Sequence, residues 1–295
     1  MLKAVYYVYG MRTPWLLNII SLTMSNSGIC TRIVGGKNTL NFKQYFLKDG
    51  KVVSPFHDIP LHSDNGTYNM VVEIPRFSNA KLEISKELPG NPIKQDVKKG
   101  ALRYVKNVFP YTGYPWNYGA LPQTWEWPEH LDKHTNAKGD NDPLDVLEIG
   151  GMIFETGSII PVKVLGVMAL LDEGETDWKI LAINTADPQA ALLNSLEDVE
   201  KLMPGLLDAT RRWFRLYKVP DGKPKNEFAF EGKFQSAVFA QAIIEESFGF
   251  WKNLKSGKVA SQGIDIAPCD QVQLGSEEPG QPLPRDINAF YYVQD

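Results

Sequence analysis

The chain has 295 residues, of which 43% are hydrophobic and 22% are charged. These values are typical of a globular protein and exclude collagen-like and low-complexity chains, and a chain of this length buries roughly three quarters of the surface that it exposes when unfolded. The 31 cationic and 35 acidic residues leave a formal net charge of -4, whereas nonspecific nucleic-acid binders are usually basic. We therefore expect no nucleic-acid partner.

The two cysteines, Cys30 and Cys269, stand near opposite ends of the chain, and the four histidines are widely scattered. We therefore expect neither a disulfide framework nor a zinc site, because each needs thiols or imidazoles at characteristic spacings. This cysteine usage favours a reducing, cytoplasmic location.

The first 48 residues contain no Asp or Glu but six Lys or Arg. The apolar stretch at 15–22 is interrupted by Asn18, is too short to span a membrane and lacks a convincing cleavage site, so neither a secretory signal nor a membrane partner is expected. We interpret residues 1–28 as an extension, with Met24 as an alternative start of the functional chain. Import into an organelle, with a mitochondrial location, is the alternative.

Apolar residues alternate with other residues at 68–74 and again at 81–84. This pattern predicts a β-hairpin, in which the two charged side chains of the second strand, Lys81 and Glu83, share one face and its apolar side chains enter the core. Residues 102–127 are aromatic and interrupted by Pro and Gly, which indicates loops around a strand.

Runs of β-branched and aliphatic residues at 145–149, 158–171 and 178–184 predict three more strands, of which the last two form a hairpin with the acidic tip 172–177. Helical spacing appears only later, at 206–216 and at 237–254. After residue 256 the chain is rich in Gly, Pro and Gln, and the aromatic segment 287–293 is expected to dock on the body as a strand or strap. The order predicts a mainly β fold with flanking helices.

The segment Asp140-Asn141-Asp142-Pro143-Leu144-Asp145 places three carboxylates in six residues. If these side chains converge with the acidic tip 172–177, each unscreened pair at about 5 Å costs on the order of 3 kcal/mol at an effective dielectric of 20. A Mg²⁺, Mn²⁺ or Ca²⁺ ion would relieve that repulsion. Two solvated acidic turns are the alternative, whereas an EF-hand is excluded because Asp145 and Gly151 occupy its Gly and Glu positions.

A complementary set of cationic and phenolic side chains accompanies the acids: Lys81, Arg103, Lys179, Lys218, Lys223, Tyr114, Tyr118 and Tyr217. Together with a divalent cation, these residues favour a small phosphate-bearing polyanion as ligand. The sequence has no Walker loop or dinucleotide fingerprint, which weakens the case for a nucleotide. A metal-dependent hydrolase of another phosphate ester and an OB-like nucleic-acid binder stay open as alternatives.

The run Asp-Asn-Asp-Pro-Leu-Asp-Val at 140–146 resembles in full the signature of the soluble family I inorganic pyrophosphatases. Further segments look like the eukaryotic branch of that family: 56–61, 73–76, 80–84, 117–119, 169–179 and 219–224. The resemblance extends over residues 31–254.

The resemblance implies a single pyrophosphatase domain at 29–255, built on an OB-like five-stranded barrel with flanking helices, and a tail at 256–295 that packs on it. It also implies an inorganic diphosphatase that hydrolyses pyrophosphate to two orthophosphates, using about three to four Mg²⁺ ions and a metal-bridged hydroxide. Members of the eukaryotic branch are typically homodimers.

The resemblance also assigns roles to individual residues. The implied metal ligands are Asp140, Asp145 and Asp177 for the tightly bound ions, with Asp172 and Glu83 for ions that arrive with the substrate. The implied phosphate-binding residues are Arg103, Lys81, Tyr118, Tyr217 and Lys218, with Lys179 beside the metals and the leaving group. Asp142 corresponds to the base that contacts the attacking water, and Tyr114 to a proton donor.

Overall fold

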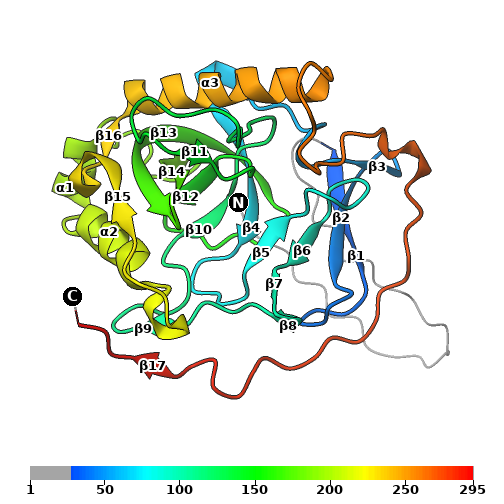
Figure 1. Ribbon diagram of the computed structural model, residues 1–295, viewed down its shortest axis with the longest axis horizontal. Coiled ribbons are helices and arrows are strands. Elements are labelled where there is room, and N and C mark those ends of the chain that lie inside the picture. The colour runs from blue at the N-terminus through cyan, green and yellow to red at the C-terminus, as the bar shows by residue number, and fades with distance from the viewer. Residues whose placement is uncertain (1–27, 295) are drawn as a thin grey trace, which may run out of the picture.

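The computed structural model describes residues 28–294, in which three α-helices accompany a mainly β body (Figure 1). The helices are α1 (Leu196–Leu202), α2 (Leu206–Leu216) and α3 (Ala237–Lys255). The strands are β1 (Ile29–Val34), β2 (Lys43–Lys48), β3 (Lys51–Val53), β4 (Tyr68–Ile74), β5 (Leu82–Ile84), β6 (Ile93–Gln95), β7 (Val97–Lys98), β8 (Ala101–Leu102), β9 (Asn107–Val108), β10 (Asn117–Ala120), β11 (Lys138–Gly139), β12 (Asp145–Glu148), β13 (Ile159–Asp172), β14 (Glu175–Asn184), β15 (Glu227–Phe228), β16 (Gln235–Ser236) and β17 (Phe290–Tyr291). Short 3-10 turns lie at Asp64–Gly66, Val219–Asp221, Ala229–Gly232 and Cys269–Gln271.

The central sheet pairs β4, β10, β12, β14 and β13 in that order, and β13 pairs again with β4. Each of these five strands therefore has two partners in the set, and only the β12–β14 pair is parallel. On β14, Ile180 joins the core cluster that contains Ile244 of α3, whereas its neighbour Leu181 joins the cluster that contains Trp213 of α2. Both faces of β14 are buried, which explains the continuous apolar run at 180–183.

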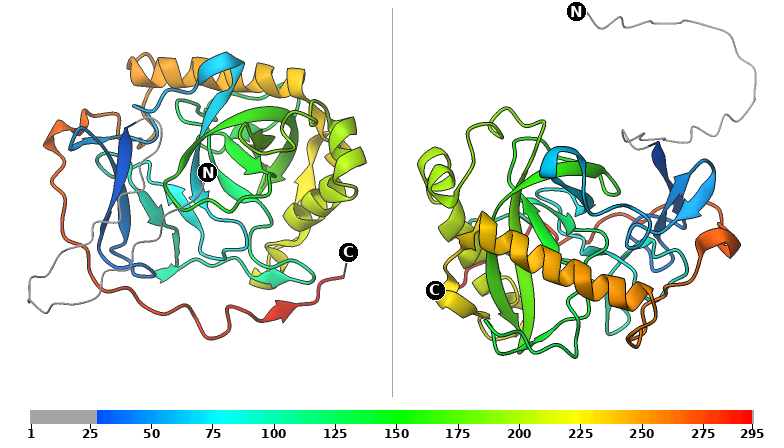
Figure 2. Two further views of the ribbon diagram at one scale, coloured as in Figure 1. Left: turned by 180° about the vertical axis from the view of Figure 1, so that it is seen from behind. Right: turned by 90° about the horizontal axis from the view of Figure 1, so that it is seen from above.

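A second sheet, β1-β2-β6-β5, lies to one side of the central sheet (Figure 1), and β3 pairs with the same edge of β2 as β6. Its apolar face includes Phe46 and Ile93, which pack in one cluster with Trp125 and with Leu254 of α3. α3 extends along the body and contributes to the clusters under both sheets, as the view from above shows (Figure 2). The helix thereby ties the second sheet to the central one.

The predicted hairpin at 68–84 is wrong. β4 has β10 on one edge and β13 on the other, so it has no free edge for β5, which pairs with β6 instead. The segments still meet through a side chain, because Glu73 accepts a hydrogen bond from the Ile84 amide at 2.7 Å. The predicted faces of β5 agree with the structure, since Lys81 lies 3.1 Å from Glu83 and Ile84 is buried.

The other predicted elements are confirmed, whereas α1 and several strands, among them β1, β2 and β6 of the second sheet, were not predicted. β12, β13 and β14 occupy the three predicted runs, and β13 and β14 form the predicted hairpin across the turn residues Glu173 and Gly174. α2 and α3 lie where helical spacing indicated them. α1 begins at a capping box formed by Ser195 and Asp198. Its seven residues make only about two turns, so its apolar spacing is too short to stand out as a helical pattern.

The C-terminal tail follows the surface of the body from β3 to β9 (Figure 1). Backbone hydrogen bonds join it to residues 35–37, and β17 pairs in parallel with β9. A Cβ at Gly36 would lie 2.3 Å from the Pro279 carbonyl oxygen, so the close approach of the tail requires glycine there. The predicted extension 1–28 lies outside the described residues except for Gly28. In the part of the chain that the structure describes, no helix has both the length and the apolar character that a membrane span needs.

His57 joins three separate parts of the chain. Its Nδ1 accepts a hydrogen bond from the Trp251 indole of α3 at 2.9 Å, and its Nε2 lies 3.1 Å from the Asp265 carbonyl oxygen in the tail. The ring also stacks on Phe56. Burial, assisted by the charge of Lys255, lowers the pKa of His57 to about 4, so the folded protein holds this residue neutral.

We expect the free energy of unfolding to fall as pH falls from about 6.5 to about 4. In this window the unfolded chain binds a proton at His57 that the folded chain does not, so the stabilisation is complete above pH 6.5 and is lost on acidification. The full effect is about 3 kcal/mol. Urea unfolding at pH 7 and pH 5 measures it, and His57→Gln should flatten the pH dependence. If the free energy of unfolding changed equally with pH in the unchanged chain and in His57→Gln, His57 would not be the group responsible.

Candidate active site

The segment 140–145, called the acidic loop below, leads from β11 into β12, and Asn141 sets its shape. Asn141 has φ +71°, in the left-handed region that Asn tolerates better than most residues. Its side chain accepts a hydrogen bond from the Trp125 indole at 3.0 Å and donates one to the Gln262 carbonyl at 3.1 Å. The Asp142 amide then donates to Asp140 at 2.9 Å. The loop is thus fixed by its own residues and by two distant segments.

β12 and β14 bring the loop to a buried lysine. Their parallel register places Asp145 beside Lys179, and the Lys179 ammonium contacts Asp145 as well as Asp177, the latter at 2.5 Å. Burial alone would lower the pKa of Lys179, but Asp145 and Asp177 outweigh it and raise that pKa. Burial raises the pKa of Asp177 to about 7, against the opposing effect of Lys179.

Three tyrosines line the same region. The Tyr118 hydroxyl donates to Asp145 and lies 3.0 Å from the Lys179 ammonium. Tyr114 packs on Tyr118 with ring centroids 5.1 Å apart, and Tyr217 stacks on Trp213. Burial raises the pKa of Tyr114 to about 12 and also raises the pKa of Tyr118 and Tyr217. The three phenols therefore stay protonated near neutral pH and can donate hydrogen bonds.

A second charged group lies at the edge of β5. Lys81 is 3.1 Å from Glu83 and 3.3 Å from Asp96, and Arg103 is 3.0 Å from the same Asp96 oxygen. Lys81 and Arg103 outweigh the effect of burial and lower the pKa of Asp96. Asp96 thus holds the two cations side by side.

A third group joins the end of β13 to the residues after α2. Lys218 reaches both carboxylate oxygens of Asp172, one of them at 2.6 Å. Lys223 instead pairs with the exposed Glu173 at 3.0 Å. Lys218 is buried, whereas Lys223 is half-buried at the rim.

The structure brings every predicted site residue into one connected region. Asp140 interacts electrostatically with Asp142, Asp145, Asp177 and Lys179. Tyr217 interacts electrostatically with Asp172 of the third charged group. Arg103 of the second charged group interacts in the same way with Tyr114. The remaining link runs from Glu83 to Asp142.

Four residues of this region were missed by the sequence analysis: Glu73, Lys86, Asp96 and Glu126. Lys86 pairs with Asp142 at 2.6 Å. Glu126 is 4% exposed, and oxygens of Glu126, Asp140 and Asp177 lie within 4.8 Å of one another. In the sequence, Glu126 stands between two tryptophans, Trp125 and Trp127, which indicates a buried position. A buried carboxylate is unfavourable unless it has a partner, so this pattern could have marked Glu126 as a candidate.

The donor chemistry of this cluster fits a hard divalent cation. Every oxygen donor is a carboxylate, and His and Cys, which select softer metals, do not contribute to the group among residues 28–294. Glu126 Oε2 is buried and has no hydrogen-bond partner, which leaves it available to a cation. A hard divalent cation such as Mg²⁺, Mn²⁺ or Ca²⁺ therefore suits the site.

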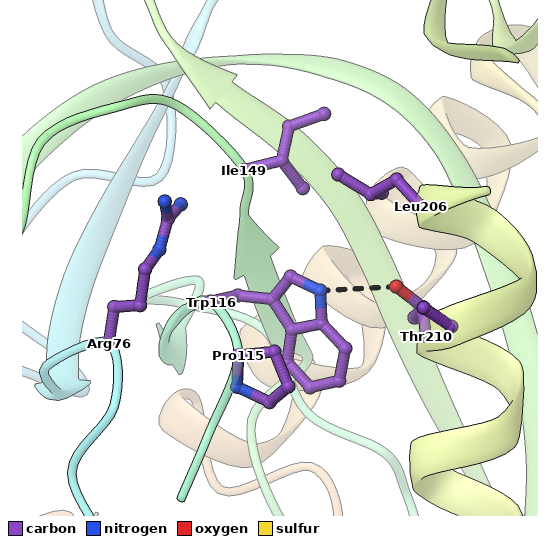
Figure 3. Close-up of a pocket in the computed structure, with 7 residues that line it drawn as sticks. Arg76, Pro115, Trp116, Ile149, Leu206 and Thr210 are labelled. Atoms are coloured by element: carbon purple, nitrogen blue, oxygen red, sulfur yellow. Dashed lines mark hydrogen bonds between the residues drawn. The ribbon is translucent and has the colours of Figure 1, made fainter. Parts of the chain in front are cut away.

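A separate hollow of about 110 Å³ lies between α2 and the segment around Trp116 (Figure 3). The Trp116 indole donates to Thr210 across it at 3.1 Å, and Arg76 stands at its other side. Its lining includes none of the predicted site residues, so the hollow is distinct from the charged region.

Comparison with known proteins identifies the family. The sequence model of the inorganic pyrophosphatase family matches residues 70–252. The Kluyveromyces lactis inorganic pyrophosphatase is 53% identical over 279 residues, which cover 89% of this chain and 97% of that protein. The Bos taurus inorganic pyrophosphatase is 58% identical over 228 residues, covering 77% and 78%. The solved structure of the Schistosoma japonicum inorganic pyrophosphatase has a TM-score of 0.85 at 47% identity, covering 89% of this chain and all of that chain. These matches place the chain in the inorganic pyrophosphatase family, within its soluble, eukaryotic-type branch.

Proposed function

We propose that the chain is an inorganic diphosphatase that hydrolyses pyrophosphate to two orthophosphates in the presence of Mg²⁺. The observation that carries this proposal is the enclosure of a buried carboxylate cluster by cations. Carboxylates attract divalent metals, and the surrounding ammonium and guanidinium groups attract phosphate. The cations concerned are Lys81, Arg103, Lys179 and Lys218.

The metal-binding residues in this proposal are Asp140, Asp145, Asp177, Asp172 and Glu83. When bound, Mg²⁺ neutralises phosphate charge and makes water a stronger nucleophile. We propose that about three to four ions take part, since phosphoryl-transfer sites commonly place metals on both sides of the reacting bond.

The roles proposed for the chain's own groups are supported by their positions. Asp142 is partly exposed and linked to Lys86, so it can orient an attacking water and accept its proton. Lys81 and Arg103 bind one phosphate, because Asp96 holds their charges side by side. Lys218, Tyr217 and Tyr118 bind phosphate through their ammonium and phenol donors.

We assign Lys179 and Tyr114 to the leaving phosphate, which departs when the P–O–P bond of pyrophosphate breaks. The Lys179 ammonium neutralises charge that builds on the leaving phosphate. Tyr114, whose pKa of about 12 keeps its phenol protonated, donates a hydrogen bond there. Positioning and charge stabilisation thus account for most of the acceleration.

We also propose that the five mutually paired central strands form an OB-like barrel within a single domain at 29–255. The support is that β4, β10, β12, β14 and β13 each have two partners in the set, and a closed sheet has no free edge.

Orthophosphate release from pyrophosphate and from ATP, each measured with Mg²⁺, tests the proposed function. Rapid release from pyrophosphate and little from ATP is the expected result. Preference for ATP or another phosphate ester would favour the general phosphohydrolase, and no release from either would favour a binding role.

Mg²⁺ should activate the enzyme and Ca²⁺ should inhibit it. Mg²⁺ demands tight octahedral geometry, whereas the larger Ca²⁺ takes more ligands at longer distances and would misplace the attacking water. Steady-state rates with each ion, followed by Ca²⁺ added to the Mg²⁺ enzyme, measure the effect. Comparable turnover with both ions would contradict the geometric argument.

We propose that two copies of the chain form a homodimer. The support is a surface cluster of three aromatic residues, in which the Phe109 ring contacts the rings of Phe290 and Tyr292. Tyr292 is 80% exposed. Exposed apolar clusters often mark protein contacts. Sedimentation analysis of the chain and of Tyr292→Ser tests it, with a shift toward monomer expected in the variant.

We propose a cytoplasmic location, with mitochondrial import through residues 1–28 as the alternative. Deleting residues 1–23 should leave folding and pyrophosphate hydrolysis almost unchanged, because this stretch contains no Asp or Glu to serve the metal cluster. Circular dichroism and phosphate release check the deletion, and fluorescent fusions of both lengths report location. A folded but inactive protein would show that the extension takes part in function.

A further inference from the structure

The backbone that leads into Tyr114 is packed tightly against other segments. Gly113 has φ +52°, and a Cβ there would lie 2.3 Å from the Ser78 carbonyl oxygen. The Gly113 carbonyl accepts a hydrogen bond from the Trp213 indole at 3.0 Å, and the Tyr114 amide donates one to the Ser78 carbonyl at 3.0 Å. The position of Tyr114 therefore depends on how Gly113 is held.

Asn107 holds the amide of Gly113. Its side chain is buried, and its Oδ1 accepts hydrogen bonds from the Gly113 amide at 2.9 Å and from Asn79 Nδ2 at 2.7 Å. Asn79 Nδ2 also donates to the Val105 carbonyl at 2.8 Å. One oxygen atom of Asn107 thus joins the turn before Tyr114 to the segment that precedes β5.

The C-terminal tail fixes which way the Asn107 amide points. Asn107 Nδ2 donates to the Ile287 carbonyl at 3.0 Å, and β17 pairs with β9, which begins at Asn107. A reversed amide would direct its NH₂ group at the two N–H donors and its oxygen at the Ile287 carbonyl oxygen, so all three hydrogen bonds would be lost. The tail therefore keeps Oδ1 facing Gly113.

The ring of Tyr114 has little room to compensate for a backbone shift. It lies between the rings of Tyr118 and Trp213, with centroids 5.1 Å and 5.0 Å away, and the residue is buried. A movement of the Gly113 backbone would therefore carry the Tyr114 hydroxyl with it. A displacement of about 1 Å at a reacting group can lower a rate by about 10²-fold.

We propose that Asn107 is a positioning residue for Tyr114, which holds the Gly113 amide so that the phenol reaches the leaving phosphate. This inference rests on the proposed pyrophosphate hydrolysis and adds to it a residue that does not itself contact the substrate. Lys81 keeps its own contacts with Glu83 and Asp96, so phosphate binding should depend less on Asn107 than the chemical step does.

Steady-state hydrolysis of pyrophosphate by the full chain tests the proposal. We expect Asn107→Ala to lower kcat by about 10- to 100-fold. KM should change little, because an interaction made mainly in the transition state affects kcat and kcat/KM alike. Asn107→Asp keeps acceptors for the Gly113 and Asn79 donors and needs no fixed amide orientation, so it should recover most of the lost kcat.

The Trp213 indole gives a second readout that does not depend on activity. Its N–H donates to the Gly113 carbonyl, so its NMR signal reports the position of this backbone. With the signal assigned through Trp213→Phe, we expect it to shift in Asn107→Ala and to stay near its original position in Asn107→Asp.

Two control variants separate positioning from other effects. Asn184 is similarly buried, and its Oδ1 accepts a hydrogen bond from the Ala186 amide at the end of β14 that is remote from Asp177. Asn184→Ala should therefore lower stability without lowering kcat. Tyr292→Ser, which is expected to weaken association of two copies, leaves the contacts of Asn107 in place and should also retain kcat.

An unchanged kcat in folded Asn107→Ala would overturn the proposal, as would a rise in KM alone. A comparable loss of kcat in either control variant would overturn it too, because instability or dissociation would then be the cause. The same holds if Asn107→Asp is as slow as Asn107→Ala, or if the Trp213 signal does not move while kcat falls.

If Asn107→Ala does not fold, Asn107→Ser replaces it, because the shorter side chain cannot reach all three partners, and an unchanged kcat there has the same meaning. Failure of the proposed function gives a different result. The unchanged chain would then release no phosphate from pyrophosphate, whereas the Trp213 signal would still show whether Asn107 holds the backbone before Tyr114.

Discussion

Replacing Asp142 by Asn should lower kcat by about 10²- to 10⁴-fold, the usual range for a general acid or base. The Asp142 side chain is 44% exposed and its ion pair with Lys86 is open to solvent, so the pair contributes only about 0–1 kcal/mol and the variant should fold. Mg²⁺ affinity should change little, because the role assigned to Asp142 is proton transfer.

Asp145→Asn provides the contrast. Asp145 is less exposed and contacts both Lys179 and Tyr118, and its proposed role is to hold Mg²⁺. This variant should bind Mg²⁺ more weakly, and part of its lost activity should return at high Mg²⁺. Lys179 keeps Asp177 as a partner, so the variant should still fold.

The measurement is kcat against Mg²⁺ concentration for both variants, with metal binding followed by calorimetry and folding by circular dichroism. Full recovery of Asp142→Asn at high Mg²⁺ would show that Asp142 is a metal ligand rather than the base. No recovery of Asp145→Asn, with unchanged Mg²⁺ affinity, would remove it from the metal site.

The acidic loop could be predicted because its chemistry is local. Three carboxylates in six residues, with Pro143 among them, are visible without knowledge of the fold. The β13–β14 hairpin was equally accessible, since a two-residue turn joins two long apolar runs. Where neighbouring residues decide the structure, the sequence predicts it well.

Asp96 and Glu126 could not be found in this way. Asp96 gains its role only when Lys81 and Arg103, from segments on either side, meet on one of its oxygens. Glu126 depends on the packing of its segment between the acidic loop and β14. The place of Glu126 between two tryptophans indicates burial but not its role, because partners distant in sequence define the roles of both residues.

The error at the predicted β4–β5 hairpin has the same origin. Alternating apolar residues indicate that a segment is a strand but do not name its partner. β10 and β13, which follow much later in the chain, occupy both edges of β4. Competition between distant strands therefore decided a pairing that adjacency in sequence favoured.

Lys179 carries the largest expected effect on stability. Its side chain is 3% exposed, and its ammonium contacts Asp145, Asp177 and the Tyr118 hydroxyl. The ring of Phe214 lies 5.4 Å away. This one buried cation compensates two carboxylates, the buried Asp177 and the partly buried Asp145, in the absence of metal.

Lys179→Met should lower the free energy of unfolding by about 3–5 kcal/mol in metal-free buffer, because removing one partner leaves buried charges uncompensated. The loss should be smaller at pH 5 than at pH 8, since the pKa of Asp177 is already raised to about 7 and protonation removes its charge. Mg²⁺ should restore part of the stability by replacing the lost cation.

Urea unfolding of the two proteins, at both pH values and with or without Mg²⁺, measures these effects. Lys223→Met is the control, because Lys223 pairs with the exposed Glu173 at the rim and such surface pairs contribute about 0–1 kcal/mol. If Lys179→Met lost no more stability than Lys223→Met, the buried carboxylates would need another source of compensation. If its loss were independent of pH and Mg²⁺, missing packing around the lysine stem rather than missing charge would be the cause.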